Sequence, residues 1–237
     1  MTRNSAAFAR TTSIPVSTLL LPALLVIGLA ACGDSTGPAG QYSQEAVDYY
    51  VEVALGSEYG NSSPVVRKWR HDIVIGIEGE PSEADLAEFD RVVAELNELR
   101  RGPRIRRAAP AVEPNVRLHF APASSFGDIL PEYVPGNRGF FWYWYNHRNE
   151  IIAAVVLIDN TDAISQTFRN HLIREEITQA LGLAKDSPRY PGSIFYDRST
   201  PAPVEYTPLD REVIQIHDLP GILPGMTEAQ VRKALGR

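Results

Sequence analysis

The chain has 237 residues and carries 23 Lys and Arg against 29 Asp and Glu, a net charge of −6 that argues against nucleic acid as a partner, because phosphate binding needs a basic surface. Its apolar share of 44% allows a sizeable core and excludes wholesale disorder. The single cysteine excludes a disulfide framework within one chain and a multi-cysteine zinc site.

The N-terminal residues have the pattern of an export signal. Arg3 and Arg10 precede an apolar run over residues 19–31, which Pro22 interrupts and which is too short to span a membrane comfortably. The run ends in Leu29-Ala30-Ala31-Cys32-Gly33. This ending resembles the lipobox of bacterial lipoproteins, in which a signal peptidase cuts before a cysteine that is then lipidated. The alternative is an ordinary signal peptide with an incidental cysteine.

The lipobox interpretation divides the chain into three parts. Residues 1–31 are a lipoprotein signal peptide, residues 32–42 are the lipidated cysteine with a short tether, and residues 43–237 are one domain. Two or three acyl chains on Cys32 would hold the protein stably on a membrane. We therefore expect an exported, lipid-anchored protein, on the outer membrane if the host is Gram-negative, since Gly33 rather than Asp follows the cysteine.

Helices and strands alternate beyond residue 42. Apolar residues at spacings of three and four predict the helices, and runs of β-branched or aromatic residues predict the strands. Helices are expected over residues 43–55, 82–101, 165–183, 209–218 and 227–235, and strands over residues 72–77, 115–120, 139–145 and 151–158. This interleaving in one stretch predicts a single domain of the α/β (α+β) class.

Five arginines gather between residues 100 and 107, directly after the second predicted helix. Cations are favoured near a helix C-terminus, so a solvated loop explains them. The alternative is that they contact anionic lipid headgroups or a partner protein.

The helix predicted over residues 165–183 has polar residues within its apolar sector. On a helical wheel Glu176 and Gln179 fall among leucines and isoleucines, and Glu175 lies at the border. The same wheel places His171 and Arg174 on a polar side, towards solvent. A carboxylate among apolar residues must be paired, hydrogen-bonded or protonated. Either these groups satisfy neighbouring backbone in the core, or they line a cleft that the helix crosses.

The sequence of this helix resembles a known catalytic motif. Residues Glu175-Glu176-Ile177-Thr178-Gln179-Ala180-Leu181-Gly182-Leu183 resemble the HExxHxLGL helix of zincin metallopeptidases. Downstream, Ser193-Ile194-Phe195-Tyr196 resembles the Ser-Ile-Met-Tyr turn of metzincins. The resemblance implies a zincin-like fold with a mixed sheet over roughly residues 70–220, and Glu176 at the general-base position.

This chain departs from that motif at the metal ligands. Glu175 and Gln179 replace the two zinc-binding histidines, Lys185 stands at the third ligand position, and Phe195 replaces the turn methionine. These substitutions resemble a group of uncharacterised bacterial secreted proteins catalogued as a domain of unknown function, with an EExxQxLGL…SIF pattern. The resemblance to that group implies no established activity.

Two alternatives to a site without metal follow from the residues. A divalent metal at a non-standard site would use Glu175, Gln179 and Asp186 or a histidine from elsewhere, and the glutamine carbonyl suits Ca²⁺ better than Zn²⁺. A hydrolase triad from Ser193, a histidine and Asp186 has no nucleophile-elbow sequence to support it. His119 and His147 are metal candidates by exclusion only.

Six consecutive aromatic residues occupy positions 140–145. An alternating strand would bury about half of them and expose the rest, which makes Phe140, Trp142 and Trp144 candidate binding residues. Zincins bind extended peptides along an edge strand beside the active-site helix, and an aromatic edge strand can bind in this way without catalysis. The alternative is that the rings cover the core and rim of a sheet.

The function predicted from the sequence is that of a cell-envelope lipoprotein with a degenerate zincin-like domain. It would bind peptide, protein or cell-wall material without zinc catalysis and without a cofactor. One alternative is a peptidase or other hydrolase with Glu176 as general base and an unusual metal or none. The other is a structural lipoprotein that uses its aromatic or arginine surface.

Overall fold

The computed structural model of the protein describes residues 41–57, 63–197 and 202–237. The signal peptide, Cys32 and most of the tether predicted from the sequence lie outside the described residues. Within these ranges, no helix combines the length and the apolar character that a membrane crossing requires.

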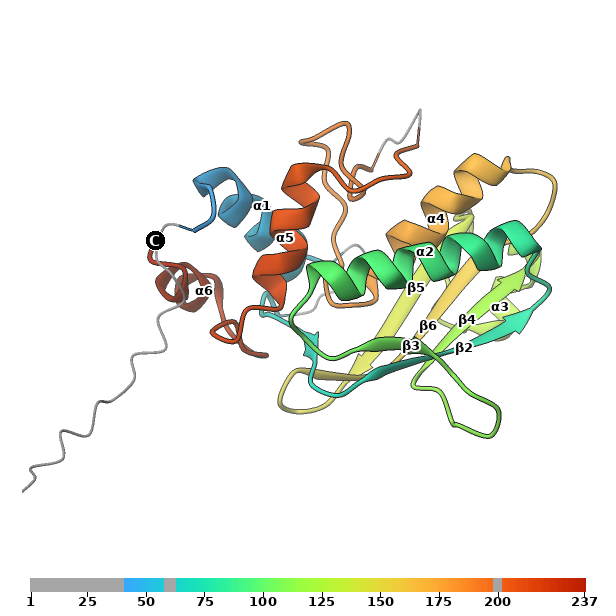
Figure 1. Ribbon diagram of the computed structural model, residues 1–237, viewed down its shortest axis with the longest axis horizontal. Coiled ribbons are helices and arrows are strands. Elements are labelled where there is room, and N and C mark those ends of the chain that lie inside the picture. Colours follow the sequence, from blue (N-terminus) through green and yellow to red (C-terminus); the bar gives the residue numbers. More distant parts are fainter. Residues whose placement is uncertain (1–40, 58–62, 198–201) are drawn as a thin grey trace, which may run out of the picture. The chain divides into compact units, whose positions relative to one another are not determined.

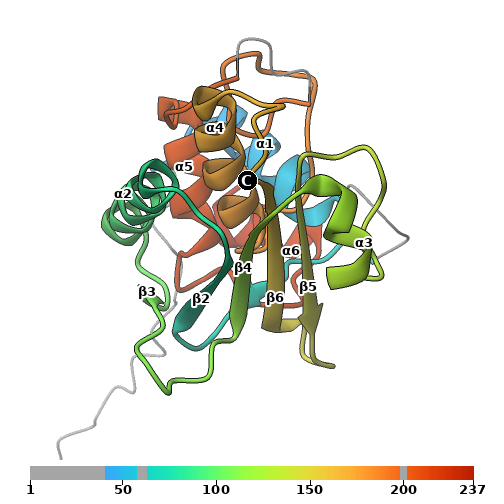
Figure 2. The same cartoon turned by 90° about the vertical axis from the view of Figure 1, so that its right-hand side faces the viewer.

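The centre of the domain is a six-stranded mixed sheet. Its strands are β1 (Lys68–Trp69), β2 (Ile73–Gly79), β3 (Ile105–Arg107), β4 (Val116–Ala121), β5 (Gly139–Tyr145) and β6 (Glu150–Asp159). Strands β3, β2, β4 and β6 are neighbours in that order and parallel, and β1 pairs with the first residues of β6. β5 is antiparallel to β6, so β3 and β5 are the two outer strands (Figure 2).

Seven helical segments accompany the sheet. They are α1 (Gln44–Leu55), α2 (Glu83–Leu99), the 3₁₀ turn η1 (Ala123–Ser125), α3 (Phe126–Ile129), α4 (Gln166–Gln179), α5 (Pro208–His217) and α6 (Glu228–Ala234). Helices α2 and α4 pack on one another over one face of the sheet, and α1 contacts α5 and α6 (Figure 1). The short α3 lies near the other face, where Phe126 packs with Phe140 and Leu157.

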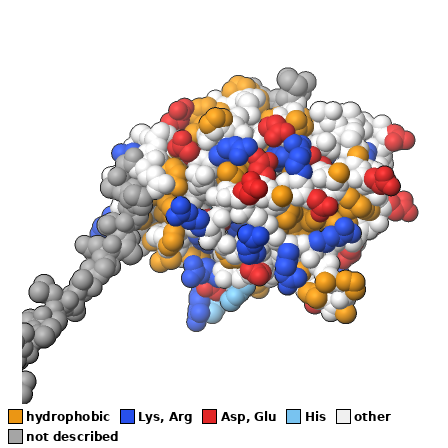
Figure 3. Space-filling model, viewed as in Figure 1, with side chains coloured by type: hydrophobic (Ala, Val, Ile, Leu, Met, Phe, Trp, Pro, Cys, Tyr) orange, Lys and Arg blue, Asp and Glu red, His pale blue; other side chains and the backbone are white. Residues whose placement is uncertain are grey.

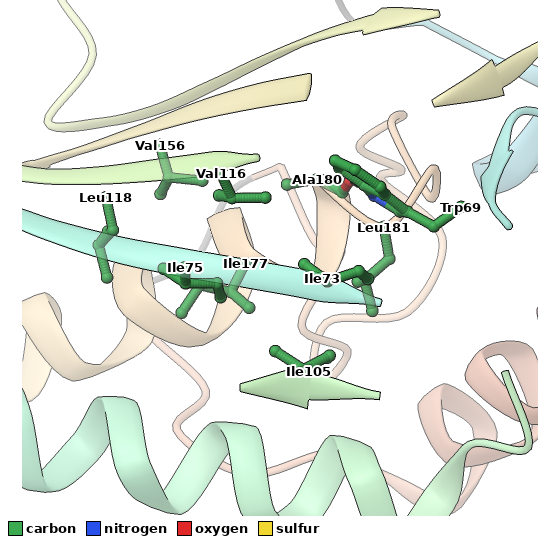
Figure 4. Close-up of a pocket in the computed structure, with 10 residues that line it drawn as sticks. All are labelled: Trp69, Ile73, Ile75, Ile105, Val116, Leu118, Val156, Ile177, Ala180 and Leu181. Carbon is green, nitrogen blue, oxygen red and sulfur yellow. Dashed lines mark hydrogen bonds between the residues drawn. The ribbon is translucent and has the colours of Figure 1, made fainter. Parts of the chain in front are cut away.

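The main core lies between the sheet and α4. Inward-facing residues of β1 to β4 and β6 meet Ile177, Ala180 and Leu181, and the Trp69 indole donates a hydrogen bond of 2.9 Å to the carbonyl oxygen of Ala180 (Figure 4). The cavity between them holds only about 10 Å³. A space of that size is at the lower limit for one water, and its walls are apolar, so this cavity is a packing gap and not a ligand site.

Helix starts agree with the capping signals in the sequence. Ser43, Ser165 and Thr207 each accept a hydrogen bond from a backbone N–H of the first turn, and Ser82 forms a capping box with Asp85. The predicted α/β (α+β) class and all nine predicted elements are confirmed, with bounds that differ by a few residues.

The largest difference in bounds is at the end of α4. This helix ends at Gln179 and not at residue 183, because the chain turns through Gly182 with φ +112°. A Cβ atom at Gly182 would lie 2.0 Å from the carbonyl oxygen of Arg67, so only glycine fits this turn. Strands β1 and β3 and helix α3 were not predicted, because they are too short to show a period, and β3 contains two of the five clustered arginines.

The predicted exposure of one side of α4 was wrong. His171 is 1% exposed and Arg174 is 0% exposed, because α2 and residues 203–206 cover the side of the helix that the wheel places towards solvent. Arg174 forms ion pairs with Glu95 at 2.6 Å and Glu88 at 3.4 Å. The polar side of α4 is therefore an internal charged layer.

We expect Arg174→Met to destabilise the fold strongly. The change removes a fully buried cation and leaves Glu88 and Glu95 with only Arg91 and Arg211 as partners, so we expect a cost of about 3 kcal/mol, the lower end of the range for breaking a buried pair. The midpoint of urea denaturation measures the loss. Arg117→Ala is the control, because this half-exposed arginine pairs with surface glutamates and its loss costs less than about 1 kcal/mol. Equal destabilisation by both changes would contradict the prediction.

Candidate functional site

The polar residues of α4 border a cleft of about 240 Å³ beside the start of β5. Three segments form its walls: the residues that lead into β5, one side of α4, and the chain after α4. The lining residues are Gly136, Asn137, Arg138, Gly139, Phe140, Phe168, Leu172, Glu175, Glu176, Gln179 and Asp186. The structure therefore brings together all four residues predicted as catalytic or metal-binding.

Glu176 approaches the backbone of β5 closely. A Cβ atom at Gly139 would lie 2.4 Å from Glu176 Oε1 and 2.9 Å from Leu172 Cδ2. Glycine at position 139 thus leaves room for the carboxylate, and Glu176 itself is 6% exposed. The carboxylate at the predicted general-base position lies in the cleft wall and is shielded from bulk solvent.

Gln179 and Asp186 contact each other across the cleft. The amide Nε2 of Gln179 donates a hydrogen bond to Asp186 Oδ1, and Gln179 is buried. Asp186 belongs to the segment after α4, where Ser187 pairs with Tyr196. This bond ties the last turn of α4 to the chain that follows it.

Glu175 forms an ion pair with His171 one turn earlier. The distance from His171 Nε2 to Glu175 Oε2 is 3.1 Å, and His171 Nδ1 lies 2.8 Å from the carbonyl oxygen of Pro203. Both ring nitrogens face oxygen acceptors, which favours the imidazolium form. Burial opposes that charge, but Glu175 and the Pro203 carbonyl outweigh it and raise the pKa of His171 above its ordinary value.

The side chains of the cleft do not form a metal site as they are oriented. Glu175 turns to His171, while Gln179 and Asp186 bond to each other. Over residues 41–57, 63–197 and 202–237, no group of three or more His, Cys, Asp or Glu side chains is placed to hold a metal ion. The candidate histidines lie elsewhere: His119 Nδ1 is 3.5 Å from Glu78, and His147 is exposed in the turn between β5 and β6.

The Ser193–Phe195 turn is part of the core. Ser193 is 1% exposed, and its hydroxyl donates to Asp210 at 2.5 Å and accepts from the N–H of Phe195 at 3.1 Å. Burial raises the pKa of Asp210, and hydrogen bonds from Ser193 and Thr207 oppose the rise. Ser193 therefore holds the turn against the start of α5 and does not pair with Asp186 in a triad.

The aromatic strand β5 is graded in exposure and does not alternate. Phe140 and Phe141 are buried, Trp142 is half-buried, and Trp144 and Tyr145 are 39% and 43% exposed. The start of β5 is covered on both faces, by α4 on one and by the segment around Phe126 on the other, whereas its end extends past both. The expected alternation is thus replaced by a gradient along the strand.

The candidate aromatic residues share one face of the sheet. Phe140 and Trp142 pack with Leu157 on the face away from α4, and Trp144, two residues further on, continues that row. Phe140 also borders the cleft, but its ring is buried among its neighbours. Trp142 and Trp144 remain as accessible aromatic residues, on the other face from the cleft carboxylates.

Arg138 contributes to the wall of the cleft and was not among the residues predicted from the sequence. Arg138 Nη1 bonds to Asp159 Oδ2 at 2.5 Å, which joins the start of β5 to the end of β6. Burial acts to raise the pKa of Asp159, but hydrogen bonds from Thr161 and Arg138 outweigh it and lower that pKa. The available signal was the pair of glycines at 136 and 139 before an aromatic strand, since paired glycines mark close backbone approach.

Comparisons with known proteins give a family. The family model described as "Protein of unknown function (DUF2927)" matches residues 43–237. No curated protein matches the chain.

Two solved structures of myroilysin resemble the chain weakly. They share 15% and 14% identity with TM-scores of 0.31 and 0.34, over 48% and 58% of this chain. The chain spans about half the length of these structures, 43% and 54%. Likeness at this level carries no argument about the site.

We expect His171→Gln to change how stability depends on pH. A histidine whose pKa is raised by folding stabilises the fold at acidic pH, and this contribution is lost as pH rises through the raised pKa. The difference in free energy of unfolding between wild type and variant should therefore be larger at pH 6 than at pH 8.5, by about 1.4 kcal/mol per unit of pKa shift. Urea titrations at both pH values measure it. The exposed His147, changed to Gln, should show no such difference.

Proposed function

This chain belongs to the DUF2927 family, and we propose that it is a lipid-anchored envelope protein that binds an extended peptide segment of another envelope molecule along β5, without zinc catalysis. The position of β5 is the observation that carries this proposal. Among the described strands β5 pairs only with β6, so its other side is an edge of the sheet that lies beside α4 and the cleft.

An extended peptide that adds to a sheet edge gains backbone hydrogen bonds and places alternate side chains on opposite faces. At β5 one set of side chains would point towards Glu175, Glu176 and the cleft. The other set would lie beside Trp142 and Trp144. The two groups of candidate residues, which lie on different faces, would then serve one ligand.

The charge of the cleft favours a cationic group in the peptide. Glu175, Glu176 and Asp186 line it, and the cationic groups beside it are His171, which pairs with Glu175, and Arg138, which pairs with Asp159, so a net negative charge is left. A lysine, arginine or free amine in the ligand would complement these carboxylates. Cell-wall peptides with amino groups and basic segments of envelope proteins both have this chemistry.

The state of the former ligand positions supports binding over zinc catalysis. Glu175 and Gln179 stand where the resemblance to zincins implies histidines. Glu175 is held by the ion pair with His171, and Gln179 by the hydrogen bond to Asp186. Recruiting them to a metal would break both of these contacts. The anchor is supported by the sequence alone, through the lipobox that ends at Cys32.

Peptide binding should depend on both faces of β5. Trp144→Ala should weaken binding of an extended lysine-bearing peptide by roughly tenfold, as expected for an aromatic interface residue. Glu176→Gln should weaken it only a few-fold, since it removes one partly shielded charge. Calorimetry with a library of such peptides measures both. Leu223→Ala and Glu98→Gln, which change exposed residues on other elements, are the matched controls.

Two outcomes would overturn the proposal in favour of a hydrolase. One is stoichiometric bound metal that is lost on Glu175→Ala. The other is hydrolysis of the same peptides that Glu176→Gln abolishes, because a general base is essential to turnover and a binding residue is not. Unchanged affinity in Trp144→Ala would remove β5 as the binding edge.

The anchor is tested separately. Cys32→Ser should move the full chain from the membrane fraction to the soluble fraction of its host, because it removes the acyl chains that hold the protein on the membrane. Cell fractionation with a high-salt wash of the membranes, which releases protein held by charge alone, followed by immunodetection measures the change, and Ser35→Ala is the control. Membrane retention of Cys32→Ser would contradict lipid anchoring at this cysteine.

A further inference from the structure

We propose that the edge of the sheet formed by β3, with the loops beside it, is a docking surface for a membrane rich in anionic phospholipid. The surface, called here the basic edge, consists of Arg70, Arg101, Arg104, Arg106 and Arg107. The proposal rests in part on the lipid anchor proposed above, and it goes beyond that anchor by assigning the face of the domain that meets the bilayer.

The arginines of the basic edge form no ion pairs within the part of the chain that the structure describes. All five are exposed, and none forms an ion pair with a residue in the described part of the chain. Several other arginines of the domain, such as Arg91, Arg117 and Arg232, each pair with carboxylates. In a chain with a net charge of −6, five unpaired arginines on one edge are a local excess of positive charge.

The fold brings these arginines together from three segments. Backbone hydrogen bonds join Ile73 to Arg104, and the register of β2 with β3 places Val74 opposite Arg106. Arg70 and Arg101 line a common hollow of about 630 Å³ with His71, large enough for a phosphate headgroup. Figure 3 shows Lys and Arg side chains over β3 and the connection from α2 on this face.

Two acidic residues, Asp72 and Asp218, line the hollow, and each already contacts an arginine. Asp72 accepts a hydrogen bond from the N–H of Arg104 at 3.1 Å, and Asp218 is buried in an ion pair with Arg100 at 2.5 Å. Lys68 lies behind the hollow and donates hydrogen bonds to the carbonyl oxygens of His217 and Ile222. The surface therefore stays positive around the hollow.

The described chain begins beside this edge. Tyr42 is near enough to Arg101 for the guanidinium to act on its pKa, which burial raises and Arg101 lowers in part. On its other side, Arg237 donates a hydrogen bond of 2.7 Å to the carbonyl oxygen of Tyr42. The polypeptide that leads back to Cys32 thus starts between two arginines.

The length of that polypeptide limits the distance to the bilayer. Residues 33–40 join Cys32 to the described chain, and a chain of this length can reach at most roughly 30 Å. A membrane that holds Cys32 is therefore within reach of the basic edge. Attraction to anionic lipid acts within a Debye length, about 8–10 Å, and contributes only when the surface docks.

The experiment uses residues 35–237, which form one compact unit and lack Cys32. We expect this domain to float with vesicles that contain phosphatidylglycerol and not with vesicles of phosphatidylcholine alone. Arg101→Glu and Arg106→Glu should each weaken binding by at least fivefold, from the contribution of one basic residue at an anionic surface. Arg148→Glu is the matched control and should bind as wild type does, because Arg148 is exposed in the turn between β5 and β6 and forms no ion pair with any described residue. Urea midpoints verify that all variants are folded.

Several outcomes would overturn the proposal. Equal binding to both kinds of vesicle would exclude charge recognition, and equal loss in Arg148→Glu would exclude this edge. Competition by inorganic phosphate at constant ionic strength would show that the hollow binds a free anion and not a membrane surface. Because the tested unit lacks Cys32, failure here leaves the anchor proposal intact, and failure of Cys32→Ser to release the full chain leaves this one intact.

Discussion

The fold depends on satisfying the polar groups of one buried helix. Helix α4 is enclosed by the sheet, α2 and residues 203–206, and ten of its residues are buried, among them arginines, glutamates and a histidine. Each of these groups would be costly without a partner. Arg174 therefore fixes α2 through Glu88 and Glu95, and His171 fixes the backbone at Pro203. Side-chain charge, as much as apolar packing, sets where the surrounding elements lie.

The sequence was informative where local rules apply. Capping residues and apolar spacing gave every long helix and strand, because those signals act within a few residues. It did not predict burial or strand pairing that depends on contacts between elements far apart in the chain. The helical wheel of α4 could not show that α2 covers Arg174. The residues Ile105–Arg107 have the composition of a charged loop, and only their pairing with β2 makes them a strand. The segment of α4 was recognisable from the sequence, but the pairing of Glu175 with His171 was not.

Some candidate residues that are close in the sequence lie on opposite faces of the sheet, whereas others that are far apart in the sequence lie in the same cleft. Glu176 and Asp186 share a cleft with Gly139, which lies far from them in the chain. Trp142 and Trp144 follow Gly139 in the same strand but lie on the face of the sheet away from the cleft carboxylates. An edge strand accounts for both results, because its pleat directs successive side chains to opposite faces while its free backbone edge is common to both. The chemistry of this region is therefore organised around β5.

The two outer strands of the sheet carry opposite charge environments. Arginines gather at β3 and carboxylates lie beside β5, with β2, β4 and β6 between them. Strand spacing separates these edges by roughly 20 Å, about twice the Debye length at physiological salt. Each edge is thus screened from the other. If both proposals hold, a change in lipid composition would loosen the attachment at one edge while a cationic ligand at the other keeps its affinity, so attachment and capture would be electrostatically independent events.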